Sequence, residues 1–325
     1  MIRFATIGSS FVTDWFVEAS KHCKNLEYRA VYSRSADRAG AFARKYGVET
    51  RYMDLQELAA AKDIDAVYIA SPNSFHCEQA VLMLEHGKHV LCENPAASNV
   101  KELSRMIDAA RRNNVVFLEA MKNLFEPGFA AIKENLHKLG KIQRVSLNYC
   151  RYSPCYDDYK RGRISRTFDP TFSTGALMDV GVYCVHPLVG LFGEPRLLYA
   201  DALLLSTGAD VAGTIIARAG DDIQVEILYS KATQSRLPCQ IQGDAATLVF
   251  DRISNIDYAA IYHKSGEVEE LKFKKAYPTM TYQILKWYDY IKTGVLAHEH
   301  NEISLQALTF MDAVRKKSAI RFPAD

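Results

Sequence analysis

The sequence predicts an α/β protein with two domains. We expect an N-terminal Rossmann-type domain with a parallel sheet, followed by an α+β domain with a large open, mostly antiparallel sheet. Strands alternate with helices over residues 1–121, which is typical of βαβ units. Between residues 196 and 274, short strands follow one another with polar turns between them, which favours antiparallel pairing. A length of 325 residues fits two domains, which we place at 1–121 and 122–325.

In the first domain, short apolar runs predict strands and amphipathic stretches predict helices. Gly47 and Gly87 follow two of the helices directly, where glycine commonly ends a helix. The predicted strands are Ile2–Ile7, Tyr28–Tyr32, Ala66–Ala70, Val90–Cys92 and Val115–Met121. The predicted helices are Phe11–His22, Ala36–Tyr46, Ser74–His86 and Val100–Asn113, with a shorter unit at Asp54–Ala61.

The second domain begins with a helix and a strand, and then contains a polar segment without regular periodicity, Ser153–Ser173. Segments of this kind are often active-site loops. Its predicted helices are Phe129–Leu139, Gly175–Leu191, Met280–Lys292 and Ser304–Lys317. Its predicted strands are Ile142–Tyr149, Leu198–Leu204, Val211–Ala217, Ile223–Tyr229, Cys239–Gln242, Thr247–Phe250, Tyr258–Tyr262 and Val268–Phe273.

Composition excludes several classes of partner. The formal net charge is +2, so neither nucleic acid nor an anionic membrane is an expected partner. No apolar run approaches the ~20 residues that span a bilayer. The N-terminus enters a strand directly and lacks the layout of a signal peptide. Seven scattered cysteines without a C-x-x-C pair fit reduced thiols, so we expect a cytoplasmic protein without a metal centre.

The turn after the first strand predicts a dinucleotide site. It reads Gly8-Ser9-Ser10-Phe11-Val12-Thr13, where the fingerprint is G-x-G-x-x-G/A. Only Gly8 matches strictly, but Ser10 is small enough to let the backbone approach a pyrophosphate. The position between a strand and a helix supports the functional interpretation. The alternative is an ordinary βα turn.

The end of the second strand favours NADP over NAD. An NAD site usually has an acidic residue here for the ribose 2′-hydroxyl. This chain has Ser33 and Arg34, with Arg38 one turn into the next helix. A guanidinium pairs with a 2′-phosphate, which a carboxylate would repel. If the two arginines only form a solvated helix start, NAD remains open as the cofactor.

Two further strand ends carry polar motifs, Asp65-Ala66-Val67-Tyr68-Ile69-Ala70-Ser71-Pro72-Asn73-Ser74-Phe75-His76 and Gly87-Lys88-His89-Val90-Leu91-Cys92-Glu93-Asn94-Pro95. This pair resembles the Gfo/Idh/MocA family of nicotinamide-dependent oxidoreductases. That family shows segments close to D-x-V-x-I-A-T/S-P-N-x-x-H and G-K-H-V-x-x-E-K-P. The second domain matches its motif with Gly175-Ala176-Leu177-Met178-Asp179-Val180-Gly181-Val182-Tyr183. The resemblance covers essentially the whole chain. It implies cofactor contacts from Ser71, Pro72, Asn73, His76, Glu93 and Asn94.

The chain departs from the family at one position. Where the resemblance implies a lysine beside the nicotinamide, this sequence has Asn94. An amide carries no charge and exchanges no proton near neutral pH, although it can donate a hydrogen bond. The resemblance also implies a cis bond between Asn94 and Pro95. Either the chemistry differs, another residue supplies the charge, or catalysis is lost.

The resemblance assigns the remaining site residues. Asp179 and Tyr183 are four residues apart, so they share a helix face, and His186 follows on that face. Tyr183 is the implied proton donor, with Asp179 beside it as a catalytic and substrate-binding residue. Arg151 is an implied substrate contact, because dihydrodiol dehydrogenase-like members have an arginine there. The alternative is an ordinary packed helix.

Lys122 is our hypothesis for the missing charge. It follows a strand that ends at the carboxyl edge of the parallel sheet, where α/β proteins bind ligands. In dihydrodiol dehydrogenase-like members a pocket-lining tryptophan occupies this place. We expect its ammonium within about 8 Å of Tyr183, which is close to a Debye length. The alternative is a solvated lysine at a domain boundary.

The predicted function is that of an NADP-dependent oxidoreductase. The substrate implied by the resemblance is a secondary alcohol or carbonyl of a sugar, cyclitol or related diol. The alternative is a catalytically impaired nucleotide-binding sensor of the same family, which the missing lysine would fit. An open sheet in the second domain leaves one face to be covered, so we also expect a homodimer through it.

Overall fold

The computed structural model describes residues 1–325 and divides into two compact units. Unit 1 comprises residues 1–120 and 276–302, and unit 2 comprises residues 121–275 and 303–325. Both predicted sheets are present, one in each unit, and the predicted fold class is confirmed.

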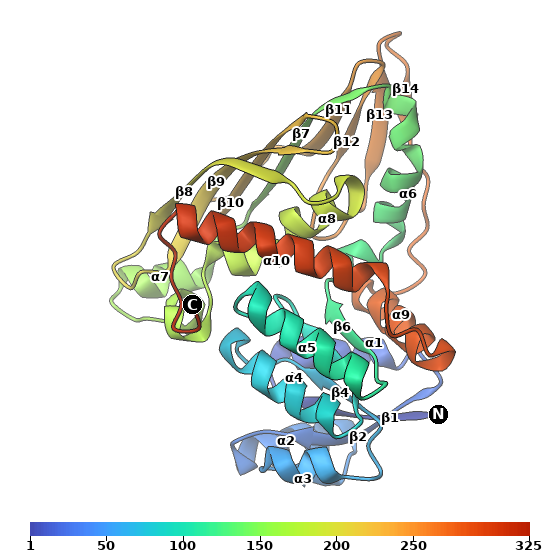
Figure 1. Ribbon diagram of the computed structural model, residues 1–325, viewed down its shortest axis with the longest axis vertical. Helices are drawn as coiled ribbons and strands as arrows, with labels where there is room; N and C mark the ends of the chain where they lie inside the picture. The colour runs from blue at the N-terminus through green and yellow to red at the C-terminus, as the bar shows by residue number, and fades with distance from the viewer. The chain divides into compact units, whose positions relative to one another are not determined.

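Unit 1 contains a six-stranded parallel sheet in the order β3-β2-β1-β4-β5-β6 (Figure 1). The order reverses between β1 and β4, and ligands bind at such a switch point, outside the carboxyl ends of the strands. Strands β4 and β6 are buried along their whole length, as expected for a sheet covered on both faces. The strands are β1 (Ile2–Ile7), β2 (Leu26–Tyr32), β3 (Thr50–Tyr52), β4 (Ala66–Ile69), β5 (His89–Glu93) and β6 (Phe117–Ala120).

Side-chain caps begin two helices of unit 1, and the predicted glycine Gly47 ends one of them. The Ser35 and Asn99 side chains accept hydrogen bonds from the first turns of α2 and α5, and Gly47 ends α2 in the left-handed conformation at φ 67°. Helices α4 and α5 pack against each other, as do α1 and α9. The helices are α1 (Phe11–Ser20), α2 (Ala36–Tyr46), α3 (Leu55–Ala60), α4 (His76–Glu85), α5 (Val100–Arg112) and α9 (Thr279–Thr293).

The second domain that we predicted at 122–325 requires a correction. Residues 276–302, which contain α9, belong to unit 1. The hydroxyl of Thr281 donates to the carbonyl of Ala19 at 3.3 Å, and Nε2 of His298 lies 3.0 Å from the carbonyl of Phe117. The segment therefore completes the Rossmann unit, although it is distant from that unit in sequence.

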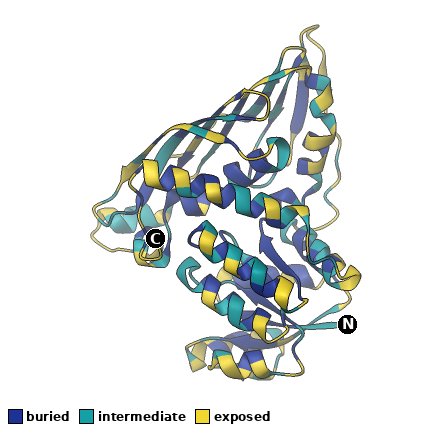
Figure 2. Ribbon diagram, in the orientation of Figure 1, coloured by how far each residue is buried: buried dark blue, intermediate teal, exposed yellow.

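Unit 2 contains an eight-stranded sheet in the order β14-β13-β12-β11-β7-β10-β9-β8. Strands β7 and β10 pair in parallel, and every other pair is antiparallel. Buried positions alternate with intermediate or exposed ones along β10, β11 and β12, as expected for a sheet with one more exposed face, and Figure 2 marks these classes by colour. The strands are β7 (Ile142–Cys150), β8 (Arg196–Leu204), β9 (Asp210–Ala219), β10 (Ile223–Ser230), β11 (Cys239–Gly243), β12 (Ala246–Phe250), β13 (Ala259–His263) and β14 (Val268–Glu270).

One predicted helix and one segment predicted to be irregular differ from the structure of unit 2. The helix predicted at Gly175–Leu191 begins as a π-helical turn, Leu177–Gly181, before it continues as α8. The segment predicted to be irregular, Ser153–Ser173, contains α7 and two short 3₁₀ turns. The helices of unit 2 are α6 (Pro127–Asn135), α7 (Pro154–Lys160), α8 (Val182–Phe192) and α10 (Glu299–Lys317), the last of which begins in unit 1.

One helical stretch, Pro170–Phe192, has the length and apolar composition of a membrane-spanning helix. Of its most apolar window, 72% is buried inside the protein. The core helix of a globular protein passes the same test, so the stretch is weak grounds for a membrane segment.

Candidate active site

The turn between β1 and α1 has the geometry of a phosphate-binding turn. Gly8 has φ +120°, and a Cβ atom at this position would lie 2.7 Å from the carbonyl oxygen of Ala70. Only glycine therefore fits at the switch point of the sheet. The backbone N–H of Ser10 donates to the hydroxyl of Thr13 at 3.3 Å, which fixes the entry to α1. The first N–H groups of a helix have no intrahelical acceptor and attract anions, so the turn suits a dinucleotide. The predicted contacts Phe11 and Val12 begin α1.

The structure brings two predicted cofactor residues together in one hollow. Ser9 and Arg38 line an open depression of about 280 Å³, together with Asp14, Phe42 and Lys45. The ammonium of Lys45 pairs with the carboxylate of Asp14 at 2.7 Å. The exposed side chain of Arg38 also lines this depression, so its guanidinium is accessible to an anion.

Arg34 and Ser33 lie at the end of β2, as the sequence predicted. The hydroxyl of Ser33 accepts a hydrogen bond from the backbone of Ser35 at 3.3 Å. The guanidinium of Arg34 lies over the ring of Phe75, 5.0 Å from its centroid. Arginine stacks well on aromatic faces while its N–H groups stay free to bind at the edge. Two exposed guanidiniums thus border α2, where a 2′-phosphate would need them.

The residues after β4 form a rigid turn, and the structure gives His76 a role within it. His76 is 1% exposed, with Nδ1 3.0 Å from the carbonyl of Pro95 and Nε2 2.8 Å from that of Ser71. Burial lowers the pKa of this imidazole. His76 thereby connects the turns after β4 and β5. Ser71, Pro72 and Asn73 are half-buried beside it, and contact of these four residues with the cofactor stays a prediction.

Asn94 directly follows β5, and hydrogen bonds hold its side chain in place. Its Nδ2 donates to Oε2 of Glu93 at 3.2 Å and to the carbonyl of Ala120 at 3.0 Å. The hydroxyl of Tyr68 donates to Oε1 of Glu93 at 2.5 Å. The bond between Asn94 and Pro95 is cis, which confirms the prediction. The amide is therefore oriented by its neighbours.

In unit 2, Asp179 lies in the π-helical turn Leu177–Gly181 and is paired with a lysine that the sequence analysis did not single out. The ammonium of Lys231 contacts Oδ2 of Asp179. Lys231 follows β10 directly. No pattern in the sequence marks this lysine, because its partner is 52 positions earlier in the chain (231 minus 179).

Tyr183 and Lys122 lie together, as we hypothesised. The ammonium of Lys122 is 5.8 Å from the centroid of the Tyr183 ring, which is inside the expected distance. The ring of Tyr149 packs edge-on against the same phenol at 5.6 Å. The buried side chain of Asn123 donates to the carbonyls of Tyr183 and Ile253 at 3.1 and 2.8 Å. Asn123, which the sequence analysis missed, thereby fixes the backbone of the tyrosine.

The two remaining substrate predictions differ in placement. Arg151 is exposed directly after β7, where its backbone N–H donates to the carbonyl of Ser230 at 2.8 Å. His186 is 1% exposed inside α8, with Nδ1 3.1 Å from the carbonyl of Val182. A buried imidazole that bonds its own helix favours a packing role, and substrate contact by His186 stays a prediction.

A third residue missed by the sequence analysis anchors the turn that carries Asp179. Asp210, at the start of β9, is fully buried, and its Oδ2 accepts a hydrogen bond from the backbone N–H of Leu177 at 2.6 Å. Burial raises the pKa of this carboxyl to about 7, against the lowering effect of backbone hydrogen bonds.

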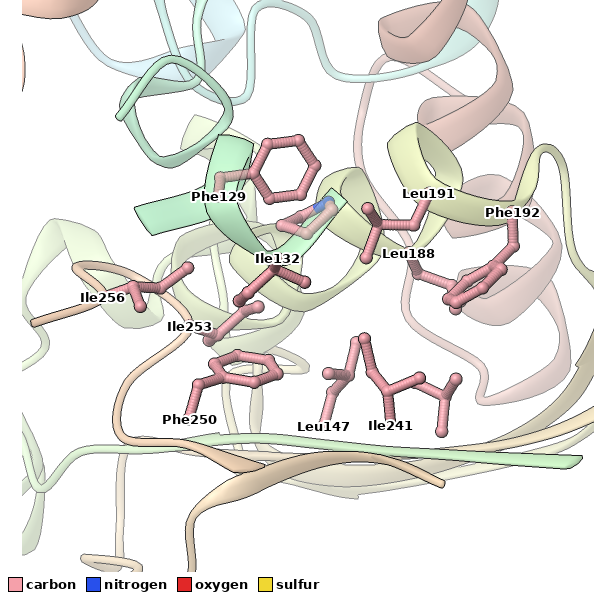
Figure 3. Close-up of a pocket in the computed structure, with 12 residues that line it drawn as sticks. Phe129, Ile132, Leu147, Leu188, Leu191, Phe192, Ile241, Phe250, Ile253 and Ile256 are labelled. Carbon is pink, nitrogen blue, oxygen red and sulfur yellow. The ribbon is translucent and has the colours of Figure 1, made fainter. Parts of the chain in front are cut away.

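An apolar cavity between α6, α8 and the sheet of unit 2 is too small for a ligand (Figure 3). Its volume is about 10 Å³, near the limit for a single water, and apolar cavities of this size stay dry. We also find no group of three His, Cys, Asp or Glu side chains able to hold a metal ion.

Comparison with known proteins defines the class. Residues 2–121 match the sequence profile of an oxidoreductase family with an NAD-binding Rossmann fold, and residues 130–249 match the GFO/IDH/MocA C-terminal domain. The chain therefore belongs to the Gfo/Idh/MocA family of oxidoreductases.

Several relatives extend over the whole chain. It is 44% identical to the scyllo-inositol 2-dehydrogenase (NADP(+)) of Bacillus subtilis, with 100% of this chain and 99% of that protein covered. It is 25% identical to the trans-1,2-dihydrobenzene-1,2-diol dehydrogenase of Mus musculus, with 93% and 87% covered. A 3-ketoreductase from Actinomadura kijaniata, crystallised with NADP and TDP-benzene, shares the fold with a TM-score of 0.85 at 21% identity over 98% of both chains.

Proposed function

We propose that this protein is an NADP-dependent dehydrogenase of cyclitols or related sugars and diols. Bound nicotinamide would exchange a hydride with a secondary alcohol carbon or the corresponding carbonyl. The observation that carries the proposal is 44% identity, over the full length, to an NADP-dependent scyllo-inositol dehydrogenase. The cations Arg34 and Arg38 beside the β2 end support NADP as the cofactor.

In unit 2, Tyr183 is the proposed proton donor or acceptor at the substrate oxygen. A phenol has an ordinary pKa of about 10, and a nearby cation favours its phenolate form. Lys122 supplies such a cation, with its ammonium 5.8 Å from the centroid of the Tyr183 ring. Asp179 and Arg151 are proposed to bind substrate hydroxyls.

The test is reduction of NADP and of NAD with a panel of inositols, sugars and vicinal diols. We expect turnover with at least one inositol and a preference for NADP. Tight nucleotide binding without turnover on any of the panel would favour the second candidate, a nucleotide-binding regulator. Asn94 is the observation behind that candidate, because its amide cannot replace the charge of a lysine.

We further propose a cytoplasmic homodimer formed through the open face of the unit 2 sheet. Tyr199, Leu203 and Leu228 are 52%, 62% and 38% exposed on one face of β8 and β10. All seven cysteines are free thiols, which suits a reducing compartment. Leu203→Glu should convert a dimer to a monomer in analytical ultracentrifugation, because it places a charge in an apolar interface. A wild-type monomer would contradict the proposal.

A further inference from the structure

The pair formed by Lys231 and Asp179 has one protected and one open side. The Lys231 side chain is 10% exposed, whereas that of Asp179 is 50% exposed. Oδ2 of the carboxylate faces the ammonium. The lysine is therefore largely buried, whereas the side chain of its carboxylate partner stays half exposed, with Oδ1 not engaged by the lysine.

The backbone of Lys231 is fixed from both sides. Its N–H donates to the carbonyl of Val211 at 2.8 Å, and its carbonyl accepts from the N–H of Ser153 at 2.9 Å. These bonds connect the end of β10 to the start of β9 and to the segment that leads into α7. The ammonium thus extends from a constrained position.

Asp179 is presented by an unusual backbone. It lies in the π-helical turn Leu177–Gly181, and single π turns within helices occur frequently at functional sites. The turn packs closely on β10, because a Cβ atom at Gly181 would lie 3.4 Å from the ring of Tyr229. Tyr229 is two residues before Lys231, so one strand end supports both the turn and the charge beneath it.

The groups around Lys231 leave it charged near neutral pH. Burial lowers the pKa of Lys231 to about 8, Cys155 on α7 opposes this decrease, and Arg151 adds to it. The carboxylate of Asp179, in direct contact, favours the ammonium form. A buried ammonium is costly unless it is paired, so the lysine and Asp179 depend on each other.

We propose that Lys231 is a positioning residue for the reaction, holding Asp179 ionised and oriented so that its exposed oxygen accepts a hydrogen bond from a hydroxyl of the polyol substrate. This proposal rests on the proposed function. It gives unit 2 a second fixed cation, besides Lys122. The motif Glu93-Asn94-Pro95 of this chain (E-N-P) lacks the lysine that the family resemblance implies.

The direct test is the titration of Asp179 in the full chain. Aspartate labelled with ¹³C at the carboxyl group reports its pKa by NMR, and Asp179→Asn assigns the signal. Lys231→Met should raise the pKa of Asp179 by about one unit or more, because an adjacent cation lowers a carboxyl pKa by 1–3 units. Lys231→Arg should retain the wild-type value. An unchanged Asp179 titration in Lys231→Met would overturn the proposal. If that variant does not fold, Lys231→Gln takes its place.

Kinetics then separate positioning from mere stabilisation. Lys231→Met should lower kcat/KM at least about tenfold and move the acidic limb of its pH profile upward with the Asp179 pKa. Lys231→Arg should restore most of the loss. Adding Lys231→Met to Asp179→Asn should cause no further decrease, because both act through one carboxylate. Additive losses would contradict the proposal.

Lys275→Met is the matched control. It removes a lysine of the same unit that pairs with the buried Glu126 at 2.8 Å, so it should lower stability without moving the acidic limb. A wild-type chain that turns over no polyol would refute the proposed function alone, because the NMR titration decides on the Lys231–Asp179 pair without turnover.

Discussion

Replacement of Asp210 tests how the turn that carries Asp179 is anchored. Asp210 is fully buried, its Oδ2 accepts from Leu177 N–H, and its Oδ1 has no hydrogen-bond partner. Burial raises the pKa of the carboxyl from 3.8 to about 7. A group whose native pKa is raised binds its proton more tightly in the folded state than in the unfolded chain.

The sign of the pH dependence follows. The protonated Asp210 carboxyl contributes fully to the free energy of unfolding below about pH 4, where it is protonated in both the folded and the unfolded chain. This contribution is lost as the pH rises to about 7. Over this window the native state binds more protons, so the free energy of unfolding decreases with pH. A shift of about three units corresponds to about 4 kcal/mol as an upper limit, at 1.36 kcal/mol per unit.

Asp210→Asn removes this titration but keeps an oxygen that can accept from Leu177. Urea unfolding of both chains at pH 4.5 and 8 gives the difference in stability at each pH, and groups common to both cancel. The variant should gain up to about 3 kcal/mol relative to wild type between the two values, because at pH 4.5 the unfolded chain has already lost most of its proton from Asp210. Asp221→Asn, at an exposed turn, is the control. A difference that does not change with pH would refute the reasoning.

Two further predictions concern the cofactor and the missing charge. Arg34→Asp should weaken NADPH binding at least about tenfold more than NADH binding in fluorescence titrations, because a charge-assisted bond is lost and a repulsion added. The exposed Arg44→Asp on α2 is its control, and equal loss for both nucleotides would refute it. Lys122→Met should reduce turnover about 100-fold with nucleotide binding intact, and Asn94→Lys in that background should restore part of it. Unchanged turnover in Lys122→Met, or an equal loss in the exposed Lys133→Met, would rule out this role.

Local signals predicted most of unit 1. Apolar runs marked its buried strands, and Gly47 marked the end of a helix, because these features are encoded within a few residues. The helix predicted at Ala36–Tyr46 has those bounds in the structure. Local signals do not encode that α9 packs on α1 and so belongs to unit 1. This packing depends on contacts such as that of Thr281 with Ala19, more than 260 residues apart.

The site was predictable where a sequence motif or the end of a parallel strand marked its residues. Gly8, Asp179 and Tyr183 came from motif positions, and Lys122 came from its place after a strand of the parallel sheet. Lys231 and Asp210 came from neither, because each acts through a partner on another element, Asp179 or the N–H of Leu177. Pairings of this kind are set by tertiary packing, to which hydrophobic periodicity is insensitive.

The structure also changes how the asparagine in the E-N-P motif is interpreted. From the sequence, Asn94 replaced the lysine that the family resemblance implies, and this replacement was the reason to keep a sensor as the alternative to an enzyme. In the structure its amide donates to both the Glu93 carboxylate and the carbonyl of Ala120. These two acceptors match the two N–H groups of an amide, which is a neutral donor. Unit 2 meanwhile places one ammonium over Tyr183 and another beneath Asp179. Positive charge beside the groups proposed to act on the substrate is what an enzyme requires and what a nucleotide sensor does not, so this charge distribution favours catalysis.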